Sequence, residues 1–144
     1  MKLIIDADAC PSIPLIEEIA KEHKVEMFLY TDFNHNIKSE YAKVIVVDQG
    51  FQSVDMHIVN VVTRNDLVIT GDYGLALMCL AKDSVVIHPN GVIYNNENID
   101  KMVFERHISS LARKRNNRIK GPKKRTKEDD VLLISNLGKI LSNK

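Results

Sequence analysis

Five short apolar runs recur along the chain, and their alternation with helix-like segments is the feature that most limits the possible folds. The runs are rich in valine, isoleucine and leucine, and they cover residues 3–5, 25–30, 44–47, 67–70 and 85–88. Segments whose apolar residues recur with the spacing of a helix follow three of them, over residues 11–23, 53–64 and 73–82. Strands that are apolar throughout are typical of a parallel sheet covered by helices on both faces. The sequence therefore predicts an α/β fold with three layers, α/β/α, and a mainly parallel central sheet.

The chain length predicts a single domain over residues 1–144, because a chain of this size suffices for one well-buried core. After the last strand, helices are expected over about residues 99–115 and 126–141. Thr126 and Asp129 have the spacing of a capping box at the start of the second helix. Residues 113–127, between the two helices, are polar and basic and contain Gly121 and Pro122, which indicates an exposed segment.

The charge is divided unevenly along the chain. Residues 1–105 carry 16 acidic and 8 basic side chains, a net charge of −8, whereas residues 106–144 carry 3 acidic and 12 basic side chains, a net charge of +9. Such a basic segment favours a polyanionic partner. The sequence has no apolar run near the roughly 20 residues of a membrane-spanning helix and no apolar core of a signal peptide. We therefore expect a cytoplasmic protein without a membrane partner.

Four aspartates are expected at the carboxyl edge of the sheet, where open parallel sheets bind ligands. Asp6 and Asp8 follow the first strand, where strand alternation would place them on one side, Asp55 begins a helix, and Asp72 follows the fourth strand. Neighbouring carboxylates repel, so they need a cation or a proton. Hard oxygen ligands suit Mg²⁺ or Mn²⁺. The four are therefore candidate metal ligands and catalytic residues, although Asp55 and Asp72 would equally suit helix capping.

Two further groups of side chains are candidates for binding. The basic segment has the charge density to contact a phosphate backbone, but it contains no aromatic residue for base stacking, which predicts salt-sensitive and weakly sequence-specific binding. The candidate nucleic-acid-binding residues are Arg113, Lys114, Arg115, Arg118, Lys123, Lys124 and Arg125. Of the five histidines, only His35, in the polar loop after the second strand, is retained as a candidate site residue.

Four motifs resemble those of a known family. They read IIDADACP from Ile4, VITGDYGLAL from Val68, HPNGVIYNNENI from His88 and GPKKRTKEDD from Gly121. These motifs resemble the YaiI/YqxD family of uncharacterised bacterial proteins, which is placed in the PIN-like nuclease superfamily. The resemblance implies a PIN-like α/β/α fold whose acidic side chains bind Mg²⁺ or Mn²⁺ for phosphodiester hydrolysis. Carried over to this chain, those residues are Asp6, Asp8, Asp55 and Asp72. Our hypothesis from the sequence is a metal-dependent nuclease-like protein that acts on RNA or single-stranded nucleic acid.

The sequence leaves two alternatives open. A haloacid-dehalogenase-like phosphatase also places Asp-x-Asp after an apolar strand, as Asp6 and Asp8 do, although the second acid expected after Gly71-Asp72 is missing. A nucleic-acid-binding module that has lost catalysis is the non-enzymatic alternative. It is favoured by Gln52, which stands where the family often has a further aspartate. A second departure is Asp130, where the family often has arginine.

Overall fold

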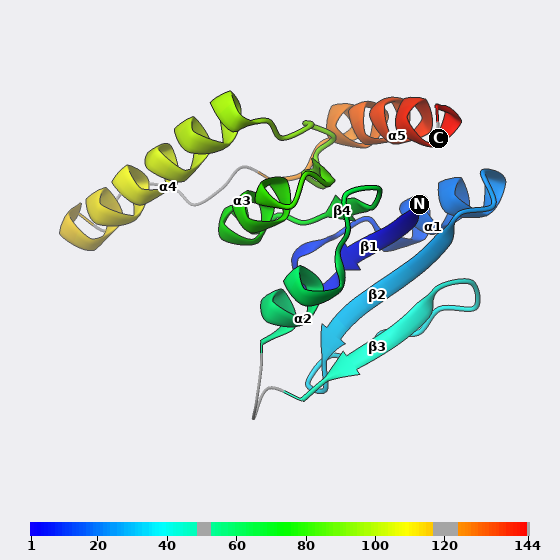
Figure 1. Cartoon of the computed structure of the whole chain (residues 1–144). Coiled ribbons are helices and arrows are strands. Elements are labelled where there is room, and N and C mark those ends of the chain that lie inside the picture. Colours follow the sequence, from blue (N-terminus) through cyan, green and yellow to red (C-terminus); the bar gives the residue numbers. More distant parts are fainter. Residues whose placement is uncertain (49–52, 117–123, 144) are drawn as a thin grey trace.

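A five-stranded, entirely parallel sheet forms the centre of the protein (Figure 1). The computed structural model describes residues 1–48, 53–116 and 124–143. Gln52, Arg118 and Lys123 lie outside these residues. The strands are β1 (Lys2–Asp6), β2 (Glu26–Asp32), β3 (Lys43–Val47), β4 (Leu67–Ile69) and β5 (Val85–Ile87). Their order in the sheet is β3-β2-β1-β4-β5, which confirms the predicted parallel sheet and puts β1 between β2 and β4.

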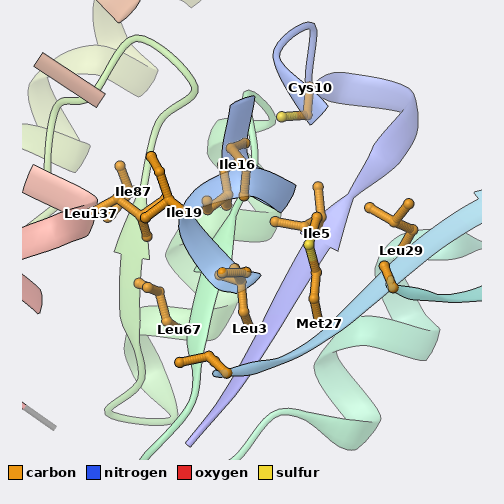
Figure 2. Packing of buried hydrophobic residues seen from close by; sticks show 14 of the residues in the cluster. Leu3, Ile5, Cys10, Ile16, Ile19, Met27, Leu29, Leu67, Ile87 and Leu137 are labelled. Carbon is orange, nitrogen blue, oxygen red and sulfur yellow. The ribbon is translucent and has the colours of Figure 1, made fainter. Parts of the chain in front are cut away.

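Helices cover both faces of the sheet, as the apolar strands predicted. The helices are α1 (Ile13–Glu22), α2 (Val54–Val61), α3 (Tyr73–Ala81), α4 (Asn96–Asn116) and α5 (Lys127–Ser142). Leu3 and Ile5 of β1 face α1 and α5, where they pack in one buried cluster with residues such as Ile16 and Leu137 (Figure 2). Ile4, between them, belongs to a second cluster with α2, α3 and the start of α4. The alternation of side chains along β1 therefore divides the core into two layers.

The two C-terminal helices differ in how they are attached. α4 extends past α3 and away from the sheet (Figure 1). α5 begins with the predicted capping box, in which Thr126 and Asp129 each accept a hydrogen bond from the other's backbone N–H. α5 then buries Leu133, Leu137 and Leu141 against the sheet. Among the described residues, no helix is both long and apolar enough to span a membrane.

The strand order brings three strand ends together at one edge. Asp6 lies opposite Tyr30 of β2, and on its other side Ile5 pairs with Ile69, the last residue of β4. Because all the strands are parallel, the loops that follow β1, β2 and β4 leave the sheet at the same edge. The candidate acidic residues follow these strands or begin the helix after β3, so the fold places them around the end of β1.

Candidate metal centre

Asp6 lies at the centre of the acidic side chains. It is the last residue of β1 and is only 4% exposed. The Thr70 hydroxyl, immediately beyond β4, donates a 2.8 Å hydrogen bond to Asp6 Oδ2. The pKa of Asp6 is raised to about 6, chiefly by burial and further by the negative charges of Asp55, Asp72 and Asp8, although the hydrogen bond from Thr70 lowers it. Asp6 is therefore a buried carboxylate whose charge is opposed by its surroundings.

Asp72 and Asp55 stand together at the starts of two neighbouring helices. Asp72 is the N-cap of α3, and its Oδ1 accepts hydrogen bonds from the backbone N–H groups of Gly74 and Leu75 at 2.9 and 3.2 Å. Asp55 lies in the first turn of α2, whose N-cap is Ser53. Burial raises the pKa of Asp55 to about 6, as do the charge of Asp72 and a hydrogen bond between the two side chains. The capping alternative is thus correct for Asp72 Oδ1, but capping does not account for the pairing of the two acids.

Gly71 allows the loops after β1 and β4 to touch. Its backbone N–H donates a 3.1 Å hydrogen bond to the carbonyl of Ala9. A Cβ at position 71 would lie 3.0 Å from the same oxygen, closer than side-chain carbons ordinarily come. Because glycine has no side chain, the turn that contains Asp8 can pack against the turn that leads to Asp72, and the hydrogen bond from Gly71 holds them together.

Asp8 belongs to a turn and not to the strand. β1 ends at Asp6, and residues Ala7–Ala9 form a single turn of 3₁₀ helix, so strand alternation does not position Asp8 as expected. Asp8 turns toward β2 instead. Its Oδ1 accepts a 2.6 Å hydrogen bond from the Thr31 hydroxyl, and its Oδ2 accepts one of 3.2 Å from the backbone N–H of Asp32. The two aspartates of the Asp-x-Asp motif are thus anchored to different strands, Asp6 toward β4 and Asp8 toward β2.

Asp8, Asp32 and His35 form the tightest group of potential metal ligands. One ligand atom of each lies within 4.8 Å of the others, and no other trio of acidic, His or Cys side chains in the described part of the chain is that close. His35 Nδ1 lies 2.7 Å from Asp32 Oδ1 and 3.3 Å from Asp8 Oδ1. The hydrogen bond to Asp32, and then the charges of Asp8 and Asp32, raise the pKa of His35. This trio could hold a metal ion, since His35 Nδ1 lies close to a carboxylate oxygen of both aspartates.

Asp32 was not expected to be part of the site. The sequence placed it in a polar loop, whereas it ends β2 and is buried. The available signal was an aspartate two residues beyond the predicted second strand and three residues before His35, the one histidine retained as a candidate.

The described basic residues have different surroundings. Arg125 is held by the fold, since its guanidinium pairs with Asp130 at 2.7 Å and donates a 2.6 Å hydrogen bond to the carbonyl of Pro89. Lys124 is exposed and lines a cleft together with Arg106 of α4. Lys114 is exposed near the end of α4, and the backbones of Arg113 and Arg115 belong to the same helix. Asp130, the departure from the family pattern, therefore fixes a neighbouring arginine.

Together, these features define the class of protein: a three-layer α/β/α protein with acidic side chains gathered at the carboxyl edge of a parallel sheet. The chain belongs to the uncharacterised YaiI/YqxD family, which matches residues 4–143.

Full-length relatives support this membership. A UPF0178 protein of Clostridium novyi is 49% identical over 142 residues, which cover 99% of this chain and 95% of that protein. A UPF0178 protein of Clostridium kluyveri is 50% identical over 143 residues, covering 99% of this chain and 94% of that protein. A UPF0178 protein of Clostridium tetani is 47% identical over 137 residues, which cover 95% of this chain and 94% of that protein. No solved structure matched the chain.

Proposed function

We propose that the protein is a nuclease-like hydrolase that depends on Mg²⁺ or Mn²⁺ and cleaves phosphodiester bonds in RNA or single-stranded nucleic acid. The observation that carries the proposal is Asp6, a buried carboxylate surrounded by the charges of Asp55, Asp72 and Asp8. Its hydrogen-bond partner Thr70 is neutral and does not compensate the charge. A bound cation would compensate it and lower the pKa of Asp6.

The donor atoms of the proposed ligands are of the type that hard divalent cations bind. Asp6, Asp8, Asp55 and Asp72 supply carboxylate oxygens, which Mg²⁺ and Mn²⁺ prefer. When bound, such an ion activates water and stabilises the charge that develops on a phosphate. The protein's own contribution is orientation, because Thr70 fixes one oxygen of Asp6 and the backbone N–H groups of α3 fix Oδ1 of Asp72.

The choice of substrate rests on charge and on the resemblance to PIN-like nucleases. Residues 106–144 carry a net charge of +9, which suits a polyanion. Two cations of this region, Arg106 and Lys124, line a cleft that also includes Gly71 and Tyr73, the neighbours of Asp72. A phosphate chain held by these cations would pass close to the acidic side chains.

The deciding experiment is cleavage of end-labelled RNA by the purified protein, with EDTA or with Mn²⁺. We expect cleavage only with Mn²⁺, and its loss in Asp8→Asn and Asp6→Asn. Asp83→Asn is the matched control, because Asp83 is an exposed aspartate in the turn between α3 and β5, at the opposite edge of the sheet. Asp83 has a positive φ of 61°, which asparagine tolerates well.

Three results would contradict the proposal. Cleavage that survives in Asp8→Asn would point to a contaminating nuclease. RNA binding without turnover would favour the binding module that has lost catalysis. Hydrolysis of a small aryl phosphate, with phosphate trapped on Asp6, would instead favour the phosphatase.

A further inference from the structure

A cleft beside the acidic side chains lies between the start of α3, the middle of α4 and residues 124–126. It encloses about 750 Å³, and we define the Tyr73 cleft by four of its lining residues: Tyr73, His88, Arg106 and Lys124. An adjoining hollow of about 710 Å³ is lined by Asp72 and shares Tyr73 and Arg106 with the cleft. Pockets for small ligands range from about 300 to 1,000 Å³. The Tyr73 cleft is therefore large enough for a nucleotide, and Asp72 of the candidate metal centre lines the hollow that adjoins it.

Planar groups line one side of the cleft. Tyr73, half-buried as the first residue of α3, has its ring centroid 6.0 Å from that of His88 and 6.1 Å from that of the buried Tyr94, which meets it edge-on. These two rings hold Tyr73 in place. The Arg106 guanidinium lies 5.6 Å from the centroid of the Tyr73 ring. Aromatic rings and guanidinium planes are the surfaces on which proteins stack unpaired bases.

The cations of the cleft are available to a phosphate. Among the described residues, neither Arg106 nor Lys124 forms an ion pair with an acidic side chain, whereas Arg125 is paired with Asp130. Asp129 also lines the cleft, but its carboxylate accepts the backbone N–H of Thr126 in the capping box. Burial lowers the pKa of His88, so this ring is neutral at neutral pH and does not repel the other cations.

We propose that the Tyr73 cleft binds one unpaired nucleotide of a nucleic-acid strand, with its base stacked on the Tyr73–Arg106 surface and its phosphate contacting Lys124. This inference rests on the proposed function and narrows the substrate to single strands, since a base within a duplex is not free to stack on a side chain. The aromatic residue that the basic segment lacks in sequence is supplied by Tyr73, which the fold brings next to Arg106 and Lys124. The nucleotide in the cleft would then lie next to the phosphodiester bond that we propose is cleaved near Asp72.

The test is equilibrium binding of a short single-stranded RNA that carries a fluorescent adenine analogue, measured in EDTA so that no turnover occurs. Stacking on a side chain quenches the analogue, so we expect quenching with the native protein and with Tyr73→Phe, which keeps the ring. Tyr73→Leu is expected to lose the quenching and to bind about 5- to 150-fold more weakly, the range that base–aromatic stacking energies imply. Lys124→Ala is expected to weaken binding and to reduce its salt dependence, because Lys124 is the proposed phosphate contact.

Matched controls lie outside the cleft. Phe104→Leu removes an exposed aromatic side chain from α4, and Arg64→Ala removes an exposed arginine between α2 and β4; both should bind as the native protein does. Native binding by Tyr73→Leu would overturn the proposal, as would equal affinity for the duplex form of the RNA. Equal affinity for free adenosine monophosphate would show that the cleft takes a free nucleotide and not a strand. Stacking that depends on Tyr73, in a protein that cleaves no RNA with Mn²⁺, would support this inference while refuting the proposed function.

Discussion

Replacing Asp6 with asparagine is predicted to stabilise the metal-free protein. Asp6 is 4% exposed, and its pKa is raised from 3.8 to about 6, chiefly by burial. Since each tenfold change in acidity corresponds to about 1.4 kcal/mol, the ionised carboxylate lowers the free energy of unfolding by up to about 3 kcal/mol at neutral pH. Asparagine removes the charge but weakens the hydrogen bond from Thr70, at a cost of about 1 kcal/mol. We expect a net gain of about 1–2 kcal/mol from these two effects.

The assay is urea unfolding in EDTA over a range of pH. The pKa of Asp6 is higher in the folded than in the unfolded protein, so the folded state binds more protons than the unfolded state between pH 3.8 and about pH 6. Its contribution to native stability therefore falls as the pH rises through this window. The stabilisation by Asp6→Asn should be absent in acid and complete above about pH 7. Adding Mn²⁺ should raise the stability of the native protein and should stabilise Asp6→Asn much less, because binding to the folded state stabilises it.

Asp66→Asn is the matched control, because Asp66 is equally buried, at 2% exposure, but compensated. Burial raises its pKa, yet hydrogen bonds from the backbone N–H groups of Lys2 and Thr63, at 3.0 and 2.9 Å, outweigh this effect, and the pKa is lowered. Asp66→Asn should therefore destabilise the protein by about 1–3 kcal/mol. If Asp6→Asn is destabilised as much as Asp66→Asn, the reasoning that Asp6 carries an uncompensated charge is refuted.

Three further predictions concern α5 and the second ligand group. Gly91→Ala should lower the free energy of unfolding in urea by at least about 2 kcal/mol, because Gly91 has a φ of 97° and a Cβ there would lie 2.4 Å from the backbone of α5. Gly138 lies within α5 itself, but a Cβ there would meet nothing within 4 Å. Gly138→Ala should therefore stabilise the protein by up to about 1 kcal/mol. Thr126→Ala removes the cap of α5 and should lower stability by about 1 kcal/mol, measured as a fall in Tm. If His35 binds Mn²⁺, its proton competes with the metal, and the hydrogen bond to Asp32 raises the pKa of His35. Calorimetry should therefore show that the affinity for Mn²⁺ still rises above pH 6.5. The same pH dependence of Mn²⁺ affinity in His35→Gln would exclude His35 as a ligand.

The strands could be predicted because each is a short apolar run, and all five predicted runs form strands of the parallel sheet. The main error in their bounds lies at the end of β2, which continues to Asp32. This extension comes from long-range pairing, since Thr31 and Asp32 lie opposite Val46 and Val47 of β3. The local sequence at residues 31–37 is polar and favours a loop. Asp32 was missed because the pairing that extends β2 is not visible in its own segment.

The Asp-x-Asp motif led to the hypothesis of a site at the end of β1, but it did not predict how each aspartate is held. The sequence predicted that Asp6 and Asp8 need compensation, and in the structure the charge of Asp8 is one of those that raise the pKa of Asp6. It did not show that Thr70 would bind one and Thr31 the other, because these threonines reach β1 only through the strand order β2-β1-β4. In the same way, Tyr73 joins the basic residues of the C-terminal region through the packing of α3 against α4.

Asp6 and Asp66 are both buried, but only Asp66 has partners that outweigh the effect of burial on its charge in the folded protein. Both are buried at an end of the sheet, and folding alone would favour hydrogen-bond donors or a cation beside each of the two charges. Asp66 has such partners: two backbone N–H groups, the Thr63 hydroxyl and the Lys2 ammonium at 3.5 Å. Within residues 1–48, 53–116 and 124–143, Asp6 has one neutral hydrogen-bond donor, the Thr70 hydroxyl, and three acidic neighbours. A charge that destabilises the folded chain at neutral pH is explained if its partner is a ligand, and the divalent cation that we propose would supply the opposite charge.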